Sequence, residues 1–174
     1  MKTKLVVVGT TLLIAWALKR HYADARADDL WWILAPTAQL AGVITATPFE
    51  MQAGEGYISR ERLFLIEKSC AGVNFIIAAF GMLMFAQVHR VASPLPAARL
   101  LASSILVAYV VTVVVNAVRI AIAMWLAENS VARSTLSAAD VHRLEGILVY
   151  FGGLMLLYEL MQRFDRRALG GDAA

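Results

Sequence analysis

"VAYVVTVVVNAVRIAIAMWLA", residues 107–127, is the stretch of sequence that decides the fold. Arg119 is its single charged residue, and crossing a bilayer takes about 20 mostly apolar residues. The apolar character begins further upstream, so we expect one helix over residues 97–127. At about 1.5 Å per residue, such a helix exceeds the ~30 Å hydrocarbon core of a bilayer. It therefore tilts in the membrane or protrudes from it.

The rest of the chain has the same apolar character. Of its 174 residues, 60% are hydrophobic, and the mean hydropathy is +0.65, which argues against a soluble globular protein. We predict one all-α domain over residues 1–174, a polytopic integral membrane helical bundle of about five transmembrane helices. Besides residues 97–127, the predicted spans are residues 5–18, 30–47, 71–88 and 147–161.

The segment before the third predicted span is different. Residues 49–69, "FEMQAGEGYISRERLFLIEKS", are rich in charge and contain Gly54 and Gly56. Apolar and polar residues alternate through "YISRERLFLI", which is typical of a strand. We expect a polar extramembrane loop with some strand or interfacial character.

Charge indicates a lipid bilayer as a partner and no nucleic acid. The net charge is +3 and the isoelectric point is near 9.2, but the basic residues lie at the ends of the predicted spans, where they face lipid headgroups. The Lys and Arg residues outside the spans divide almost evenly between the two sides, so they do not orient the chain. With five spans, the loops before the third and the fifth emerge on the same side of the membrane.

Cys70 is the only cysteine, which excludes an intramolecular disulfide, a CxxC redox pair and a cysteine-rich zinc site. We expect no metal and no cofactor. Cys70 is predicted in the first turn of the third helix with Ser69 as N-cap, where the positive helix end favours a thiolate. Asn74, four residues later, is expected on the same helix face, and Gly72 allows close backbone approach. The alternative is that Cys70 is a small buried apolar residue and that Asn74 serves packing.

Arg119 is the most informative residue because an arginine deep in a membrane helix costs about 2.5 kcal/mol or more on insertion scales. Asn116, three residues earlier, lies on the same helix face. Arg119 could instead extend its side chain to the headgroups. His142 opens the fifth span, with Asp140 as a candidate N-cap and Glu145 three residues on. A histidine at such a place is often only a solvated polar residue, although histidine also serves as an acid and base near neutral pH.

Together, Cys70, Arg119 and His142 are predicted on one side of the membrane from three separate helices. A thiol, a guanidinium and an imidazole together suit nucleophilic acyl transfer. No HExxH zinc motif, GxSxG elbow or glycine-rich phosphate loop is present in the sequence.

Three motifs carry a resemblance to a known family. "CAGVNF" from Cys70, "NAVRIAIA" around Arg119 and "HRLEGILVYFGG" from His142 resemble the three motifs of the exosortase/archaeosortase family in order, approximate spacing and helical context. The resemblance covers mainly residues 60–157. Ala71 stands where the commoner first motif has Ser, and many relatives carry additional N-terminal helices, so the chain is most similar to a compact subtype such as exosortase K.

The resemblance implies a membrane-embedded cysteine transpeptidase or peptidase. Members of that family act on exported proteins with a C-terminal sorting signal, which comprises a short motif such as Pro-Glu-Pro, a transmembrane helix and a basic tail. Carried across, it implies Cys70 as nucleophile, Arg119 as its charge partner and His142 as acid and base. It also implies a bacterial cytoplasmic membrane, with the site facing outside and the first loop and the C-terminus in the cytoplasm.

A second hypothesis retains the membrane fold without an enzymatic activity. In it the chain is a permease or an assembly subunit that binds an anionic ligand through Arg119 and Asn116. A thiol redox partner has less in its favour, because no second cysteine exists to resolve a disulfide.

Overall fold

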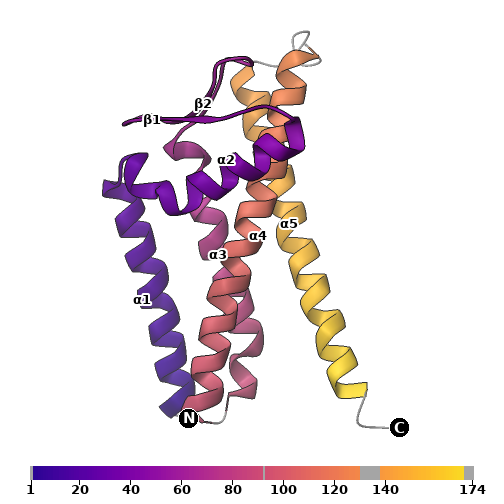
Figure 1. Ribbon diagram of the computed structural model, residues 1–174. Coiled ribbons are helices and arrows are strands. Elements are labelled where there is room, and N and C mark those ends of the chain that lie inside the picture. Colours follow the sequence, from indigo (N-terminus) through magenta and orange to yellow (C-terminus); the bar gives the residue numbers. More distant parts are fainter. Residues whose placement is uncertain (1, 92, 130–137, 171–174) are drawn as a thin grey trace.

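A computed structural model of the chain describes residues 2–91, 93–129 and 138–170, and of residues 90, 138–142 and 167–170 it describes the backbone alone. Its long helices are α1 (Lys2–Asp24), α3 (Val73–Gln87), α4 (Pro94–Glu128) and α5 (Ala138–Gly170). They run lengthwise and alternate in direction, so the start of α1 and the last turns of α5 lie at the same end (Figure 1). Short 3-10 turns join several elements: η1 (Asp28–Leu30), η2 (Lys68–Ala71) and η3 (Val88–Arg90).

Among the residues that the structure describes, three helical segments are long and apolar enough to cross a membrane: Lys68–Gln87, Pro94–Glu128 and Arg143–Arg166. They coincide with the third, fourth and fifth predicted spans. The count of about five spans is not confirmed. In the first predicted span, residues 5–18, the apolar run is short and has lysine or arginine on both sides.

Helix α1 nevertheless lies along the full length of α3. At one end, Lys4 Nζ donates a hydrogen bond to the backbone carbonyl of His89 at 2.8 Å. At the other end, Lys19 Nζ donates to Asn74 Oδ1 at 2.7 Å. The two helices are therefore antiparallel, and residues 4–19 of α1 lie alongside α3 and the η3 turn that follows it.

Helix α2 (Trp31–Thr45), which contains most of the second predicted span, lies crosswise to the long helices near one end of the bundle (Figure 1). Its proline explains how it is fixed there. Pro36 has no N–H, so the carbonyl of Trp32 one turn earlier has no partner within the helix. Tyr109 of α4 donates its hydroxyl to that carbonyl at 2.7 Å, and its ring stacks on Trp32. A part-buried carbonyl thus obtains a hydrogen-bond donor from another helix.

The polar segment folds into three short strands, β1 (Glu50–Gln52), β2 (Gly56–Ser59) and β3 (Phe64–Ile66). They form an antiparallel sheet in the order β1-β2-β3, with Met51 opposite Tyr57 and Ile58 opposite Leu65. The strand character expected from the alternation is therefore present. The sheet lies at the same end of the molecule as α2 (Figure 1).

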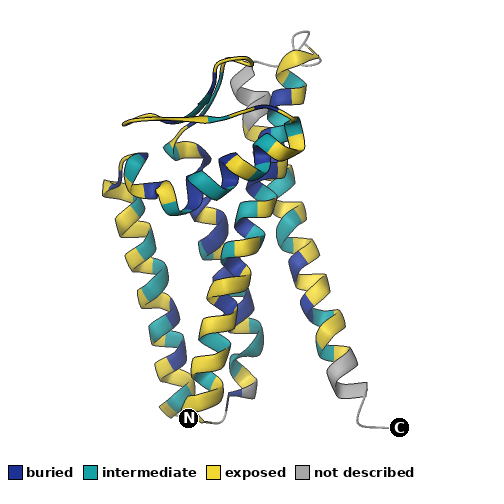
Figure 2. Cartoon of the chain, viewed as in Figure 1, coloured by how far each residue is buried: buried dark blue, intermediate teal, exposed yellow. Residues whose placement is uncertain are grey.

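Burial is concentrated where α2, α3 and α4 meet, and the outer faces of α1, α4 and α5 are largely exposed (Figure 2). Many of the exposed side chains are large and apolar, among them Leu106 and Leu148. A soluble protein rarely exposes so much contiguous apolar surface. With the three apolar helices, this surface gives the chain the character of a membrane protein.

Candidate functional site

Cys70 lies on the 3-10 turn η2, before α3 begins, and the predicted N-cap is wrong. The N-cap of α3 is Gly72, whose left-handed backbone (φ +66°) separates the Cys70 turn from the helix. Ser69 instead donates its hydroxyl to Glu67 Oε1 at 2.7 Å, and its Oγ lies 3.8 Å from Cys70 Sγ. Cys70 itself is 5% exposed. The thiol is therefore presented by a turn between the sheet and α3.

Gly72 brings this turn against α4. A Cβ at Gly72 would lie 3.2 Å from Cγ2 of Thr112 and 3.5 Å from the side-chain amide of Asn116. The left-handed conformation and the close approach both favour glycine here. The first motif thus meets the second motif directly.

Asn116 joins the two motifs through its side chain. It is fully buried, and its Nδ2 donates a hydrogen bond to the backbone carbonyl of Cys70. Its Oδ1 accepts a hydrogen bond from the Tyr150 hydroxyl of α5 at 2.8 Å. Asn116 therefore connects the Cys70 turn, α4 and α5.

Arg119 lies within the bundle and is 8% exposed. Its Nη1 donates to the Tyr150 hydroxyl at 3.3 Å, its Nε lies 3.8 Å from Glu145 Oε2, and its guanidinium carbon is 5.3 Å from the centroid of the Tyr150 ring. A buried charge with these neighbours is compensated inside the protein.

Gly146 of α5 makes room for this guanidinium. A Cβ at Gly146 would lie 3.0 Å from Nε of Arg119. One residue away, Glu145 is buried and faces the same arginine. The third motif thus contacts the second through a glycine and a carboxylate.

Of the five residues predicted for the site, the structure brings together Cys70, Asn116 and Arg119. Asn74 was expected on the face of Cys70, but it is exposed and its Oδ1 is bound by Lys19 of α1. The reason is the break at Gly72, which ends the helical relation between positions 70 and 74. The backbone of His142 belongs to α5, one turn before Gly146, and its side chain lies outside the described residues.

Tyr150 and Glu145 are site residues to which the sequence interpretation assigned no role. Tyr150 lies inside the third motif, in a run that otherwise reads as lipid-facing helix. Two signals could have identified them: Glu145 stands directly before an apolar run, and the Tyr150 hydroxyl follows Gly146 by one helical turn on the same face.

The end of α1 forms a further side of the Cys70 turn. Lys68 Nζ donates to the carbonyl of Ala23 at 3.2 Å and lies 5.0 Å from the centroid of the Tyr22 ring. Burial raises the pKa of Tyr22, and negative charge on Cys70 and on Glu67 raises this pKa further. Tyr22 thus remains a neutral hydroxyl near the thiol.

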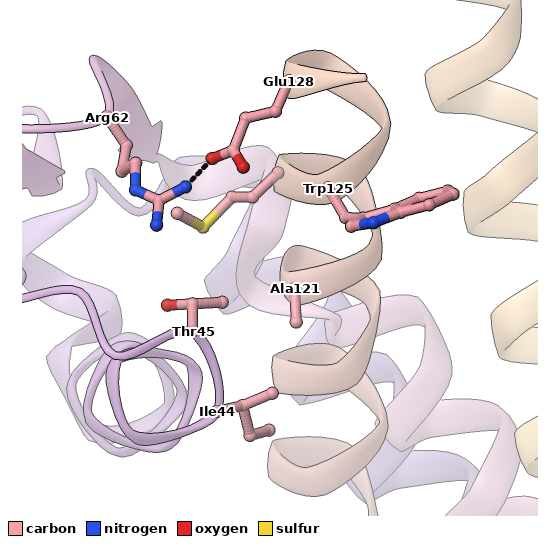
Figure 3. A pocket seen from close by; sticks show the side chains of 7 residues that line it. Ile44, Thr45, Arg62, Ala121, Trp125 and Glu128 are labelled. Atoms are coloured by element: carbon pink, nitrogen blue, oxygen red, sulfur yellow. Dashed lines mark hydrogen bonds and ion pairs between the residues drawn. The ribbon is translucent and has the colours of Figure 1, made fainter. Parts of the chain in front are cut away.

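A cavity of about 220 Å³ lies on another side of α4, under an ion pair between Arg62 of the β2–β3 turn and Glu128 (Figure 3). Ala121 and Trp125 line it from α4. An α-helix turns about 100° per residue, so these residues lie on a different face from Asn116 and Arg119. The cavity is therefore separate from the Cys70 site.

Within residues 2–91, 93–129 and 138–170, no group of three or more His, Cys, Asp or Glu residues could hold a metal ion. In comparisons with models of protein families, with curated proteins and with solved structures, nothing matches the chain.

Proposed function

We propose that the chain is a membrane-embedded cysteine transpeptidase or peptidase of the exosortase type, acting on the C-terminal sorting signal of exported proteins. The observation that carries the proposal is the hydrogen bond from Asn116 to the carbonyl of Cys70. It places the only thiol beside the motif of Arg119, which is the juxtaposition that the sequence resemblance requires.

The chemistry follows from the groups at this site. The Cys70 thiolate attacks the carbonyl carbon of the scissile peptide, and the new C–S bond leaves negative charge on the oxygen. Arg119 stabilises that charge, which is a large contribution to catalysis in a site shielded from water. When the C–N bond breaks, His142 protonates the departing amine. Water or an acceptor amine then attacks the thioester, His142 takes its proton, and Cys70 is released.

The proposal includes an arrangement in the membrane. Helices α1, α3, α4 and α5 cross the bilayer in this arrangement, because α1 runs beside α3 and η3 from Lys4 to Lys19. Helix α2 lies in the interface, with the sheet and Cys70 at the same end. This end faces the exterior of a bacterial cytoplasmic membrane in the proposal, and both termini face the cytoplasm.

The permease or assembly hypothesis has less support. Both ends of the Asn116 side-chain amide are engaged, one by the carbonyl of Cys70 and the other by the hydroxyl of Tyr150. An external anion bound by Asn116 would have to displace these contacts.

The test is the processing of an exported protein that carries such a signal, followed by immunoblot in cells that express the chain. Cys70→Ala and His142→Ala are expected to abolish processing, and His21→Ala, at an exposed histidine of α1, is the matched control that retains it. Normal processing by Cys70→Ala would refute the enzyme. The permease hypothesis predicts that Cys70→Ala is harmless and that Arg119→Ala is not.

A further inference from the structure

Tyr150 occupies a central place in the hydrogen bonds of the site. Its hydroxyl accepts from Arg119 Nη1 at 3.3 Å and donates to Asn116 Oδ1 at 2.8 Å. Asn116 in turn donates to the carbonyl of Cys70. One hydroxyl therefore connects the buried arginine to the turn that carries the thiol.

The ring of Tyr150 is held independently of its hydroxyl. Its centroid lies 5.2 Å from that of Phe75 on α3, in a tilted arrangement, and 5.3 Å from the guanidinium carbon of Arg119. Phenylalanine at position 150 would retain both ring contacts. The hydroxyl is thus a separable part of the site, and its loss does not require repacking of α3 against α5.

The hydrogen-bonding capacity of Asn116 explains why this hydroxyl matters. An asparagine side chain offers one carbonyl oxygen and one amide group, and which atom faces Cys70 depends on the partners of both. The Cys70 carbonyl can only accept, so Nδ2 of Asn116 faces it, and the Tyr150 hydroxyl holds the other end of the same amide by donating to Oδ1. Chains of hydrogen bonds in a low-dielectric interior support one another.

We propose that Tyr150 is a positioning residue whose hydroxyl orients Asn116, and through it the Cys70 turn, next to Arg119. A contribution of Tyr150 to catalysis rests on the proposed function, in which Cys70 is the nucleophile. The positioning of the Cys70 turn by Tyr150 does not rest on it, because that positioning can be measured at the thiol without a substrate.

The experiment measures the rate at which iodoacetamide alkylates the full-length protein in detergent. Cys70 is the only thiol in the chain, so the rate reports on this turn alone. Tyr150→Phe is expected to raise the rate about fivefold, the factor that corresponds to one lost hydrogen bond. Asn116→Ala is expected to raise it similarly, and the double variant no further, because both changes remove the same support.

Tyr109→Phe is the matched control, since it also removes an interhelical tyrosine hydrogen bond, to the carbonyl of Trp32. It is expected to leave the alkylation rate within about twofold of the unmodified protein, the scatter allowed for independent sites. Should Asn116→Ala fail to fold, Asn116→Ser takes its place.

Three results would overturn the proposal. Tyr150→Phe could lower the alkylation rate, or change it no more than Tyr109→Phe does. Alternatively, the double variant could raise the rate by the product of the two single increases. The two experiments fail independently. If Tyr150→Phe left the alkylation rate unchanged, the positioning role would be refuted and the processing test would still decide the enzyme. If Cys70→Ala processed the substrate normally, the enzyme would be refuted and the alkylation result would still hold.

Discussion

At the scale of single residues, the small size of Gly146 determines how closely α5 can approach Arg119. A methyl group at position 146 would lie 3.0 Å from Nε of the arginine, which is tighter than ordinary van der Waals contact. The buried guanidinium has Tyr150 and Glu145 on either side, so it cannot move without changing those contacts. We therefore expect Gly146→Ala to destabilise the protein by about 1–3 kcal/mol, the usual range for overpacking.

Gly152 of the same helix provides the control, because a Cβ there would meet nothing within 4 Å. Alanine is the better helix former by about 1 kcal/mol, so Gly152→Ala should leave stability unchanged or raise it. The measurement is thermal unfolding in detergent, followed by circular dichroism for both variants. Equal and positive shifts in the melting temperature for Gly146→Ala and Gly152→Ala would rule out the crowding of Arg119.

The site residues also mark how far a sequence can be interpreted without a structure. Arg119 and Asn116 were predicted because they are polar residues in an apolar run, three positions apart on one helix face. Tyr150 was not, because tyrosine is common in membrane helices and its role depends on a partner 34 positions earlier in the chain. Asn74 was misplaced because helical spacing was assumed across Gly72, whose left-handed backbone ends that spacing.

At the scale of elements, the contact between α2 and α4 depends on the hydroxyl of Tyr109. It satisfies the Trp32 carbonyl that Pro36 leaves without a helical partner. This hydrogen bond is part-buried, so its loss should cost about 0.5–1.5 kcal/mol, the net contribution of a typical intramolecular hydrogen bond. We expect Tyr109→Phe to lower the free energy of unfolding by this amount.

Tyr158→Phe is the control for that prediction. The Tyr158 hydroxyl accepts from Gln162 at 3.0 Å on an exposed face of α5, so its loss should cost less than about 0.5 kcal/mol. Chemical denaturation of the two variants in the same detergent compares them. If Tyr109→Phe proved as mild as Tyr158→Phe, the Trp32 carbonyl would not depend on this donor.

The elements show which sequence signals determine structure and which do not. The runs that became α3, α4 and α5 are long and apolar, and length with hydropathy sufficed to predict them. The run at residues 30–47 is also apolar, yet its helix α2 has only 15 residues and lies crosswise, with Tyr109 of α4 bound to the carbonyl of Trp32. Composition alone carries no information about such tertiary contacts.

At the scale of the whole molecule, the crosswise α2 changes the number of membrane crossings from odd to even. With five spans the two termini lie on opposite sides of the membrane. With four lengthwise helices they lie on the same side, as the start of α1 and the last turns of α5 do in Figure 1. The even division of Lys and Arg between the two ends does not decide between these arrangements. Cys70→Ser removes the only thiol, so single cysteines can be introduced to distinguish them.

In that background, we expect Lys2→Cys and Arg166→Cys to react with a membrane-impermeant maleimide from one side of the membrane, and Asp24→Cys and Glu55→Cys from the other. All four positions are exposed, so the side of access alone decides the outcome. Intact spheroplasts and inside-out vesicles present the two faces in turn. Met155→Cys, an exposed apolar position in the middle of α5, should react from neither side, because the reagent cannot enter hydrocarbon. Labelling of Asp24→Cys and Glu55→Cys from opposite sides would mean that α2 crosses the membrane after all, and would restore the five-span arrangement.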